Sequence, residues 1–187
     1  MGTHHYLTNQ LLIAMPSLAD ANFAQTVTLV CEHNDQGAMG IVINRPSSMR
    51  MADVFEQLEL QSQDELLREQ PILQGGPVQS DRGFVLHRAG KPWDSTIAVS
   101  EQIHVTTSRD ILTAIAKGDG PKQLTMALGY AGWEAGQLEA EIAQNSWLTV
   151  PFNERILFDT PFEQRWHAAA LLLGVNINTL SSQAGHA

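Results

Sequence analysis

The sequence has a single cysteine and no long hydrophobic run, and each absence excludes a class of protein. Cys31 has no second cysteine to pair with, so the fold contains no intrachain disulfide and does not require an oxidising compartment. The chain contains no run of about 18 apolar residues, which is the length that a membrane-spanning helix needs. It also has no charged-then-apolar leader and no N-x-[ST] glycosylation sequon. We therefore expect a cytoplasmic protein without a membrane partner.

Basic residues are scarce as well. Lys and Arg number 11 against 20 Asp and Glu, which gives a formal charge of -9 and an isoelectric point near 5.1. A nucleic-acid-binding protein needs cations gathered on one face to displace the counterions of the phosphates. The basic residues are instead scattered along the sequence, so we expect no direct contact with nucleic acid.

Signatures of common enzymes and metal sites are missing too. The chain has no G-x-S-x-G nucleophile elbow, no Walker sequence, and no Cys-x-x-Cys or His-Glu-x-x-His arrangement. Cys31 and His33 lie close in sequence, but two potential ligands without partners elsewhere do not make a metal site. We therefore expect neither a cofactor nor a bound metal.

What the sequence does contain is an ordinary globular composition. Hydrophobic residues make up 43% and charged residues 17% of the 187 residues, which is enough apolar surface to form a core without disulfides or metals. No internal repeat or linker divides the chain, so we expect one domain over residues 1–187. Residues 1–6 are expected to be an unstructured leader or residues added for expression.

Hydrophobic patterns predict several strands. Val27, Leu29 and Cys31 alternate along the segment 26–33, which is typical of a half-buried strand. A turn that ends at Gly37 and a return strand over 38–44 complete a hairpin, and Pro46 is expected to end that return strand. Further strands are predicted over residues 10–14, 71–74, 83–87, 95–100, 123–131 and 146–150.

Helix signals fall between these strands. Ser62 and Glu65 have the spacing of a capping box, and Gly118 stands where a helix would end. A helix capped by Thr160 is expected to bury Leu173. The predicted helices cover residues 51–60, 62–69, 106–118, 134–144 and 160–174. This order, without strict strand–helix alternation, favours an α+β fold with a mixed sheet.

Three segments together resemble the AlgH/YqgE family of bacterial proteins, whose molecular function is unknown. They are LLIAMPSLADANFAQTVTLVCEHNDQGAMGIVINRPS, GGPVQSDRGFVLH, and TTSRDILTAIAKG continuing to ALGYAGWEAGQLEAEIAQNSWL. The ending LSSQAGHA also fits, so the resemblance runs from about Leu7 to Ala187. It implies a single α+β domain whose mixed, mostly antiparallel sheet curls into a pseudo-barrel with helices packed outside.

Some members of this family carry the label of transcriptional regulator. The sequence has no pair of helices joined by a short turn and followed by a basic recognition helix. A regulatory role is therefore an alternative hypothesis in which the protein acts indirectly, without binding DNA itself.

Polar residues and glycines are concentrated where the predicted strands end, and such positions commonly carry ligand-binding groups. Arg45 could form a bidentate interaction with a carboxylate or phosphate of a ligand, or it could pair with Asp81. Asp81 and Arg82 either hold each other or hold something else. The candidate ligand- or partner-binding residues are Asn44, Arg45, Gly75, Gly76, Pro77, Asp81, Arg82, Gly129, Tyr130, Gly132 and Trp133.

The leading hypothesis is a module that binds a small molecule or a protein partner. The alternative is a hydrolase-type enzyme that uses His33 or His87 with Asp81 or Cys31, because an imidazole beside a thiol or carboxylate can support nucleophilic chemistry. Cys31 also continues the apolar set of its strand, so burial as a small apolar residue is the competing interpretation. An enzyme requires two of these groups within hydrogen-bond reach in one cleft.

Overall fold

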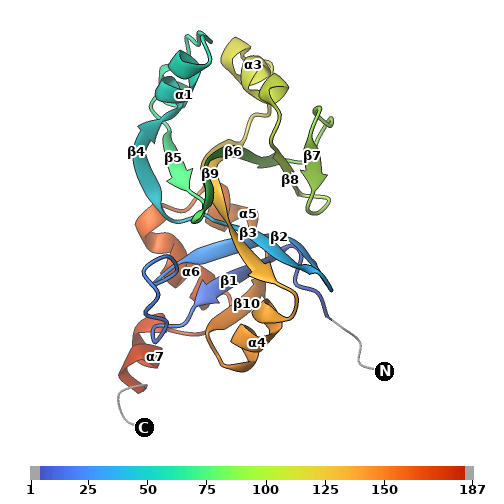
Figure 1. Cartoon of the computed structure of the whole chain (residues 1–187). Helices are drawn as coiled ribbons and strands as arrows, with labels where there is room; N and C mark the ends of the chain where they lie inside the picture. The colour runs from blue at the N-terminus through green and yellow to red at the C-terminus, as the bar shows by residue number, and fades with distance from the viewer. Residues whose placement is uncertain (1–4, 184–187) are drawn as a thin grey trace.

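The computed structural model describes residues 5–183, and its main feature is a curled ten-stranded sheet (Figure 1). The strands are β1 (Gln10–Ala14), β2 (Val27–Asn34), β3 (Gly37–Val42), β4 (Pro46–Arg50), β5 (Pro71–Gln74), β6 (Val78–Arg88), β7 (Thr96–Ala98), β8 (Ile103–Thr106), β9 (Leu124–Glu134) and β10 (Trp147–Pro151). The main path runs β10-β1-β2-β3-β9-β6-β8-β7, and every neighbouring pair along it is antiparallel. β5 branches off as a parallel neighbour of β9, and β4 pairs with β5.

The long strand β9 is where the sheet branches. Its C-terminal part pairs with β3, where Ala131 lies opposite Gly40. Its N-terminal part pairs with two strands at once, so that Ala127 lies between Phe84 of β6 and Leu73 of β5. Both halves of the curled sheet therefore share β9, and the mixed, mostly antiparallel arrangement confirms the predicted α+β fold.

The helices lie outside the curl of the sheet. They are α1 (Met51–Gln57), α2 (Glu65–Arg68), α3 (Arg109–Lys117), α4 (Gln137–Ala143), α5 (Glu154–Phe158), α6 (Arg165–Leu171) and α7 (Ile177–Gln183), with the 3-10 helix η1 (Phe162–Gln164) before α6. Helices α1 and α3 lie together at one end of the molecule, and α4 and α7 lie toward the other end (Figure 1). Helix α6 contacts β1 and β2, whereas α4 contacts β3, β9 and β10.

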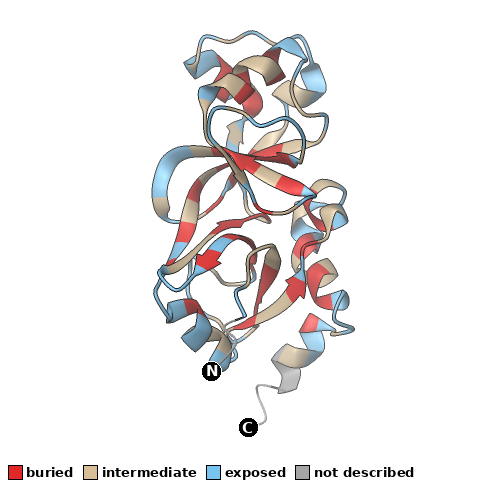
Figure 2. Cartoon of the chain, turned by 90° about the vertical axis from the view of Figure 1, so that its right-hand side faces the viewer, coloured by how far each residue is buried: buried red, intermediate tan, exposed pale blue. Residues whose placement is uncertain are grey.

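Much of the sheet is buried on both faces (Figure 2). In β2, residues 27–31 are all buried. Leu29 and Cys31 belong to one apolar cluster, and Val30 belongs to a second cluster with Trp147. The prediction of a half-buried strand is therefore wrong for this part of β2, because the cluster around Trp147 covers the face that was expected to be open.

Some strand boundaries also differ from the predicted ones. The return strand β3 ends at Val42, before Pro46, and Pro46 begins a further strand, β4, that was not predicted. Proline is tolerated there because β4 pairs with a single neighbour. Strand β6 begins at Val78 rather than at Gly83. Strand β8 and helices α5 and α7 have no counterpart among the predicted elements.

Two predicted helix starts are wrong in detail. Asp64 rather than Ser62 caps α2, because its side chain accepts a hydrogen bond from the backbone of Leu67. Thr160 does not cap a helix, because its hydroxyl donates to the carbonyl of Arg155.

The predicted burial of Leu173 is also wrong. This side chain is 42% exposed. Helix α6 ends at Leu171, so the chain leaves the helical path before position 173 reaches the core.

Positions 1–4 of the predicted leader (residues 1–6) lie outside the described residues. Residues 184–187 of the terminal segment lie outside them as well. Where the description begins, the ring of Tyr6 meets the ring of His33 edge-on, with centroids 5.1 Å apart. The backbone N–H of Leu7 donates to His33 Nδ1 over 2.9 Å. The N-terminal segment is therefore attached to β2 from these residues onward.

Candidate functional site

Asp81 and Arg82 lie inside strand β6 rather than in a loop. Because side chains alternate along a strand, Asp81 and Gly83 face one side of β6, whereas Arg82 and Phe84 face the other. The Arg82 guanidinium lies 5.4 Å from the centroid of the Phe84 ring, and its Nη1 donates to Gln79 Oε1 over 3.3 Å. Asp81 and Arg82 therefore do not hold each other.

Asp81 borders a hollow of about 470 Å³ between α1, α3 and the strands β6, β8 and β9. We call this hollow the α1–α3 cleft. Its apolar lining includes Val54, Leu58, Val85, Leu112, Met126 and Leu128, and its polar lining includes Ser80, Asp81, Thr107, Ser108 and Arg109. The cleft thus combines an apolar floor with charged and hydroxyl groups at its edge.

The polar edge of the cleft is held by fixed contacts. Arg109 Nη2 donates to the carbonyl of Leu58 over 2.7 Å, which ties the start of α3 to the end of α1. Ser108 Oγ donates to Asp110 Oδ1 over 2.6 Å, and the N–H of Asp94 donates to Asp110 Oδ2 over 2.9 Å. Burial acts to raise the pKa of Asp110, but these hydrogen bonds outweigh it and lower that pKa. Asp110 is therefore a charged, fully engaged carboxylate.

Asp81 differs from Asp110 in having no such partners. It is exposed, and among residues 5–183 no hydrogen bond or ion pair engages its carboxylate. Asp81 is therefore a carboxylate at the edge of the cleft that is open to a ligand.

Asn44 and Arg45 lie elsewhere and bond the backbone of a neighbouring loop. Asn44 Oδ1 accepts from the N–H of Val27 over 2.9 Å. Arg45 donates from Nη1 to the carbonyl of Asn22 over 2.7 Å, and from Nη2 to that of Ala24 over 2.9 Å. The hydrogen bonds of both side chains thus fasten the loop that leads into β2.

Gly76 and Gly129 allow two segments of backbone to cross closely. Both have positive φ, +154° at Gly76 and +79° at Gly129. A Cβ at Gly76 would lie 2.1 Å from the carbonyl carbon of Tyr130, and a Cβ at Gly129 would lie 2.4 Å from the carbonyl oxygen of Gly76. The segment from Gly75 to Pro77 is therefore a crossing over β9.

Four of the candidate residues meet on the opposite side of β6 from Asp81. Arg82, Tyr130, Gly132 and Trp133 line a hollow of about 630 Å³ together with two carboxylates, Glu32 and Glu134. The candidate residues are thus distributed over separate surfaces: Asp81 borders the α1–α3 cleft, these four line the wider hollow, and Asn44 and Arg45 hold a loop.

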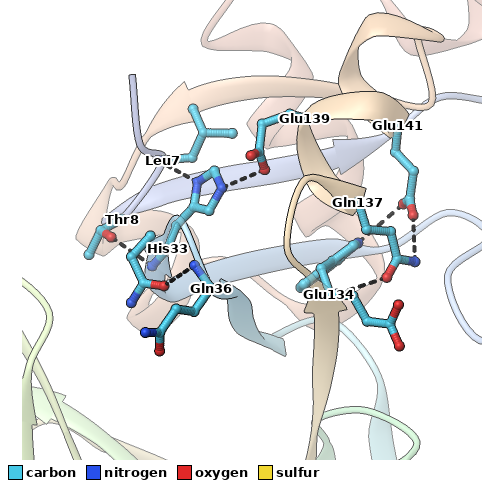
Figure 3. Close-up of polar contacts among 10 residues, drawn as sticks. Leu7, Thr8, His33, Gln36, Glu134, Gln137, Glu139 and Glu141 are labelled. Carbon is cyan, nitrogen blue, oxygen red and sulfur yellow. Dashed lines mark hydrogen bonds and ion pairs between the residues drawn. The ribbon is translucent and has the colours of Figure 1, made fainter. Parts of the chain in front are cut away.

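The four groups of the hydrolase hypothesis are not brought together in the described part of the chain. Cys31 is buried, and burial, with a smaller effect of Glu32, raises the pKa of its thiol to about 12. His33 accepts a hydrogen bond from Leu7 at Nδ1, and its Nε2 lies 2.7 Å from Glu139 Oε1 (Figure 3). Each of these groups is engaged in holding the fold.

His87 is likewise engaged within the fold. Its Nδ1 lies 2.9 Å from the carbonyl of Arg88, so it carries the proton, and its Nε2 accepts from the Thr106 hydroxyl over 2.7 Å. Burial lowers the pKa of His87, so the neutral ring is the native form.

The contribution of Arg109 and Leu112 to the cleft is not evident from the sequence pattern. From the sequence, Thr107 and Ser108 are expected to cap the helix, which indicates no further role for them. In the structure Ser108 is the N-cap residue of α3 but makes no side-chain cap hydrogen bond, and the Thr107 hydroxyl donates to Ser95 Oγ over 3.0 Å. The available signal is an arginine at a helix start, two residues before Ile111, where the apolar stripe of that helix begins.

The described residues also limit what the site can contain. No group of three or more His, Cys, Asp or Glu side chains in residues 5–183 is arranged to hold a metal ion. Across the same residues, no helix combines the length and the apolar character needed to cross a membrane.

A sequence model of the family described as AlgH-like matches residues 11–178. The chain belongs to the AlgH-like family. This confirms the resemblance seen in the sequence. The AlgH-like chain is 51% identical to a UPF0301 protein of Nitrosococcus oceani over all of both chains. It is 57% identical to one of Thioalkalivibrio sulfidiphilus over 96% of each chain.

Two solved structures agree with the fold. The solution structure of the AlgH protein from Pseudomonas aeruginosa is 54% identical and superposes with a TM-score of 0.80 over 100% of this chain and 99% of that one. A crystal structure of a Corynebacterium diphtheriae protein, 18% identical, has a TM-score of 0.75 over 97% and 94% of the two chains and supports the fold alone. These names state no reaction, ligand or partner. The function therefore has to be inferred from the geometry of the site.

Proposed function

We propose that this AlgH-like protein binds a small amphipathic molecule in the α1–α3 cleft. The observation that carries the proposal is the cleft itself, about 470 Å³ with an apolar floor and the unpaired Asp81 carboxylate at its edge. Small-molecule sites in proteins have volumes of about 300–1,000 Å³ and combine an apolar lining with a few placed polar groups. The cleft matches both properties.

The lining also indicates the chemistry of the ligand. Arg109 already donates to Leu58, whereas Asp81 can only accept, so the ligand should present a cation or a hydrogen-bond donor to Asp81. Its apolar part would replace water against Leu112 and Met126. An amine or amide with a compact hydrophobic body fits this description.

Binding is favoured over hydrolysis by the separation of the reactive groups. A hydrolase site needs a nucleophile or base within hydrogen-bond reach of a partner in the cleft. Asp81 is the one member of the hydrolase hypothesis that borders the α1–α3 cleft.

We infer that this binding takes place in the cytoplasm and involves no direct contact with nucleic acid. The buried free thiol of Cys31 needs no oxidising compartment, and the charge of -9 opposes binding to phosphates. A regulatory effect would act through the ligand or through a protein partner.

The test is a thermal-shift screen of small amines and amides, followed by calorimetric titration of each hit. A ligand at about 100 times its Kd should stabilise the native state by about 2.7 kcal/mol. Asp81→Asn should weaken binding about tenfold, because hydrogen bonds to charged groups contribute about 1.5–3 kcal/mol.

Arg82→Gln is the matched control, because Arg82 is the next residue but faces the other side of β6. It should leave the affinity unchanged. The proposal fails if no compound binds saturably, or if Arg82→Gln weakens the hits and Asp81→Asn does not.

A further inference from the structure

Lysine is unevenly distributed in this acidic protein. The chain has three lysines, Lys91, Lys117 and Lys122. Two of them, Lys91 and Lys122, line one hollow of about 490 Å³ together with Arg88, Trp93 and a single carboxylate, Asp119. We call it the lysine hollow. The lining of the α1–α3 cleft contains as many acidic as basic residues, and the lining of the wider hollow beside Arg82 contains more acidic than basic ones. The lysine hollow differs from both because basic residues predominate in its lining.

The walls of the lysine hollow are two loops that diverge where β6 and β9 part. His87 of β6 lies opposite Leu124 of β9, and the N–H of Arg88 still donates to the carbonyl of Gln123 over 3.3 Å. Beyond this point residues 89–91 and Trp93 line one wall, and residues 119–123 line the other. The hollow therefore opens at the end of a strand pair, where ligand-binding groups are commonly placed.

Both walls are held in place by specific contacts. In one loop, the N–H of Trp93 donates to Thr96 Oγ1 over 2.9 Å, and Thr96 Oγ1 lies 2.9 Å from Thr106 Oγ1. In the other loop, Gly120 packs so closely on α3 that a Cβ there would lie 2.5 Å from Ile115 Cγ1. The hollow is therefore built on fixed loops.

The ammonium groups of the two lysines are not neutralised within the described chain. Arg88 is paired with Glu154 over 2.9 Å. Lys91 and Lys122 form no ion pair with residues 5–183, and Lys91 Nζ instead lies 4.5 Å from the centroid of the Trp93 ring. A cation held over an aromatic face keeps its donors available for an anion.

We propose that the lysine hollow binds a small organic anion. The ammonium groups of Lys91 and Lys122 are the counter-charges for its phosphate or carboxylate, and Trp93 contacts its apolar part. The volume of about 490 Å³ suits a small molecule. This site shares no lining residue with the α1–α3 cleft, so each proposal can fail alone.

The experiment is a calorimetric titration of the full chain with phenyl phosphate at low ionic strength. Phenyl phosphate should bind one site per chain, and inorganic phosphate and phenol should each bind more weakly. Lys91→Gln and Lys122→Gln should each weaken the binding about threefold, and the double variant about tenfold, as expected for exposed ion pairs. Trp93→Leu should weaken phenyl phosphate but leave inorganic phosphate unchanged.

Lys117→Gln is the matched control, because Lys117 is exposed at the end of α3 and outside the hollow. It removes the same charge and should leave the affinity unchanged. Urea unfolding of every variant verifies that each one is folded. Absence of saturable binding to the folded wild type overturns the proposal, and so does an equal loss in Lys117→Gln. Tighter phenyl phosphate binding in Asp81→Asn, together with no effect of the two lysine substitutions, would place the anion in the α1–α3 cleft beside that carboxylate and also overturns it.

Discussion

At the scale of single residues, the buried side chain of Arg165 holds three separate backbone segments together. It is 5% exposed, and its guanidinium donates to the carbonyls of Thr160 over 2.8 Å, of Leu157 over 2.6 Å and of Ile43. Burial lowers its pKa to about 10, against the smaller opposing effect of Glu163. One side chain thus joins the end of β3, helix α5 and the start of α6.

Arg165→Met should lower the free energy of unfolding by about 2–4 kcal/mol. The substitution keeps the apolar stem but leaves buried carbonyls without donors, and each unsatisfied group costs about 1–3 kcal/mol. Urea denaturation measures the change, with exposed Arg155→Met as the control. Equal stabilities of the two variants would contradict the assigned role.

His87 should make the stability of the protein depend on pH. Burial lowers its pKa, and nearby His104 adds to this effect, whereas the hydrogen bond to the Arg88 carbonyl opposes it. As pH falls below about 6.5, the unfolded chain takes up a proton that the native chain does not. The native state is therefore fully favoured above that pH and loses stability below it, by at most about 1.4 kcal/mol per pH unit.

His87→Gln should reduce this loss of stability between pH 7 and pH 5. Urea unfolding at several pH values across that range measures the slope. His5→Gln, at an exposed position, should keep the wild-type slope. A slope that is the same in wild type and His87→Gln would show that other groups cause the pH dependence.

At the scale of secondary-structure elements, the sequence predicts those parts that depend on neighbouring residues. The hairpin turn at Gly37 and the end of α3 at Gly118, which has a φ of +85°, are confirmed because both depend on local backbone conformation. The N-terminal part of β6 was not predicted. Residues 79–82 are polar and exposed, so they show no alternation, and the pairing of β6 with β9 is irregular there.

The same limit applies to the candidate site. The sequence identified polar residues near strand ends, but the face that each one occupies depends on where its strand begins. Asp81 and Arg82 therefore face opposite sides of β6, and Arg45 bonds the backbone of residues 22–24. The parallel pairing of β5 with β9 places Gly76 against Tyr130, a contact between segments distant in sequence.

The crossing of the β5–β6 connection over β9 should be sensitive to any side chain. Gly76→Ala and Gly129→Ala should each destabilise the protein by more than about 2 kcal/mol, because a positive φ is strained for alanine and the Cβ meets backbone atoms. Gly90→Ala is the control, since a Cβ there meets no atom within 4 Å. Thermal or urea unfolding measures all three. Nearly neutral changes at Gly76 and Gly129 would refute this account of the crossing.

At the scale of the whole molecule, α3 and the loop that follows it contribute to the two proposed binding sites. Arg109 and Leu112 of this helix line the α1–α3 cleft. The loop that follows its last turn contributes Asp119 and Lys122 to the lysine hollow. The packing of α3 on the sheet through Ile111 and Ile115 therefore supports both sites.

Global unfolding should be the event that exposes Cys31. The thiol is buried in the central apolar cluster, and burial raises its pKa to about 12, so both access and thiolate formation are suppressed in the native state. A disulfide reagent such as Ellman's reagent should leave the native protein unmodified and react with one thiol per chain in denaturant. Rapid reaction under native conditions would contradict this burial.

Since Cys31 is the only cysteine, its rate of modification under native conditions counts opening events of the core. Arg165→Met and Gly76→Ala should both accelerate this reaction. A ligand that binds the α1–α3 cleft or the lysine hollow should slow it. The native cysteine therefore reports the rate at which the core opens, without any introduced label.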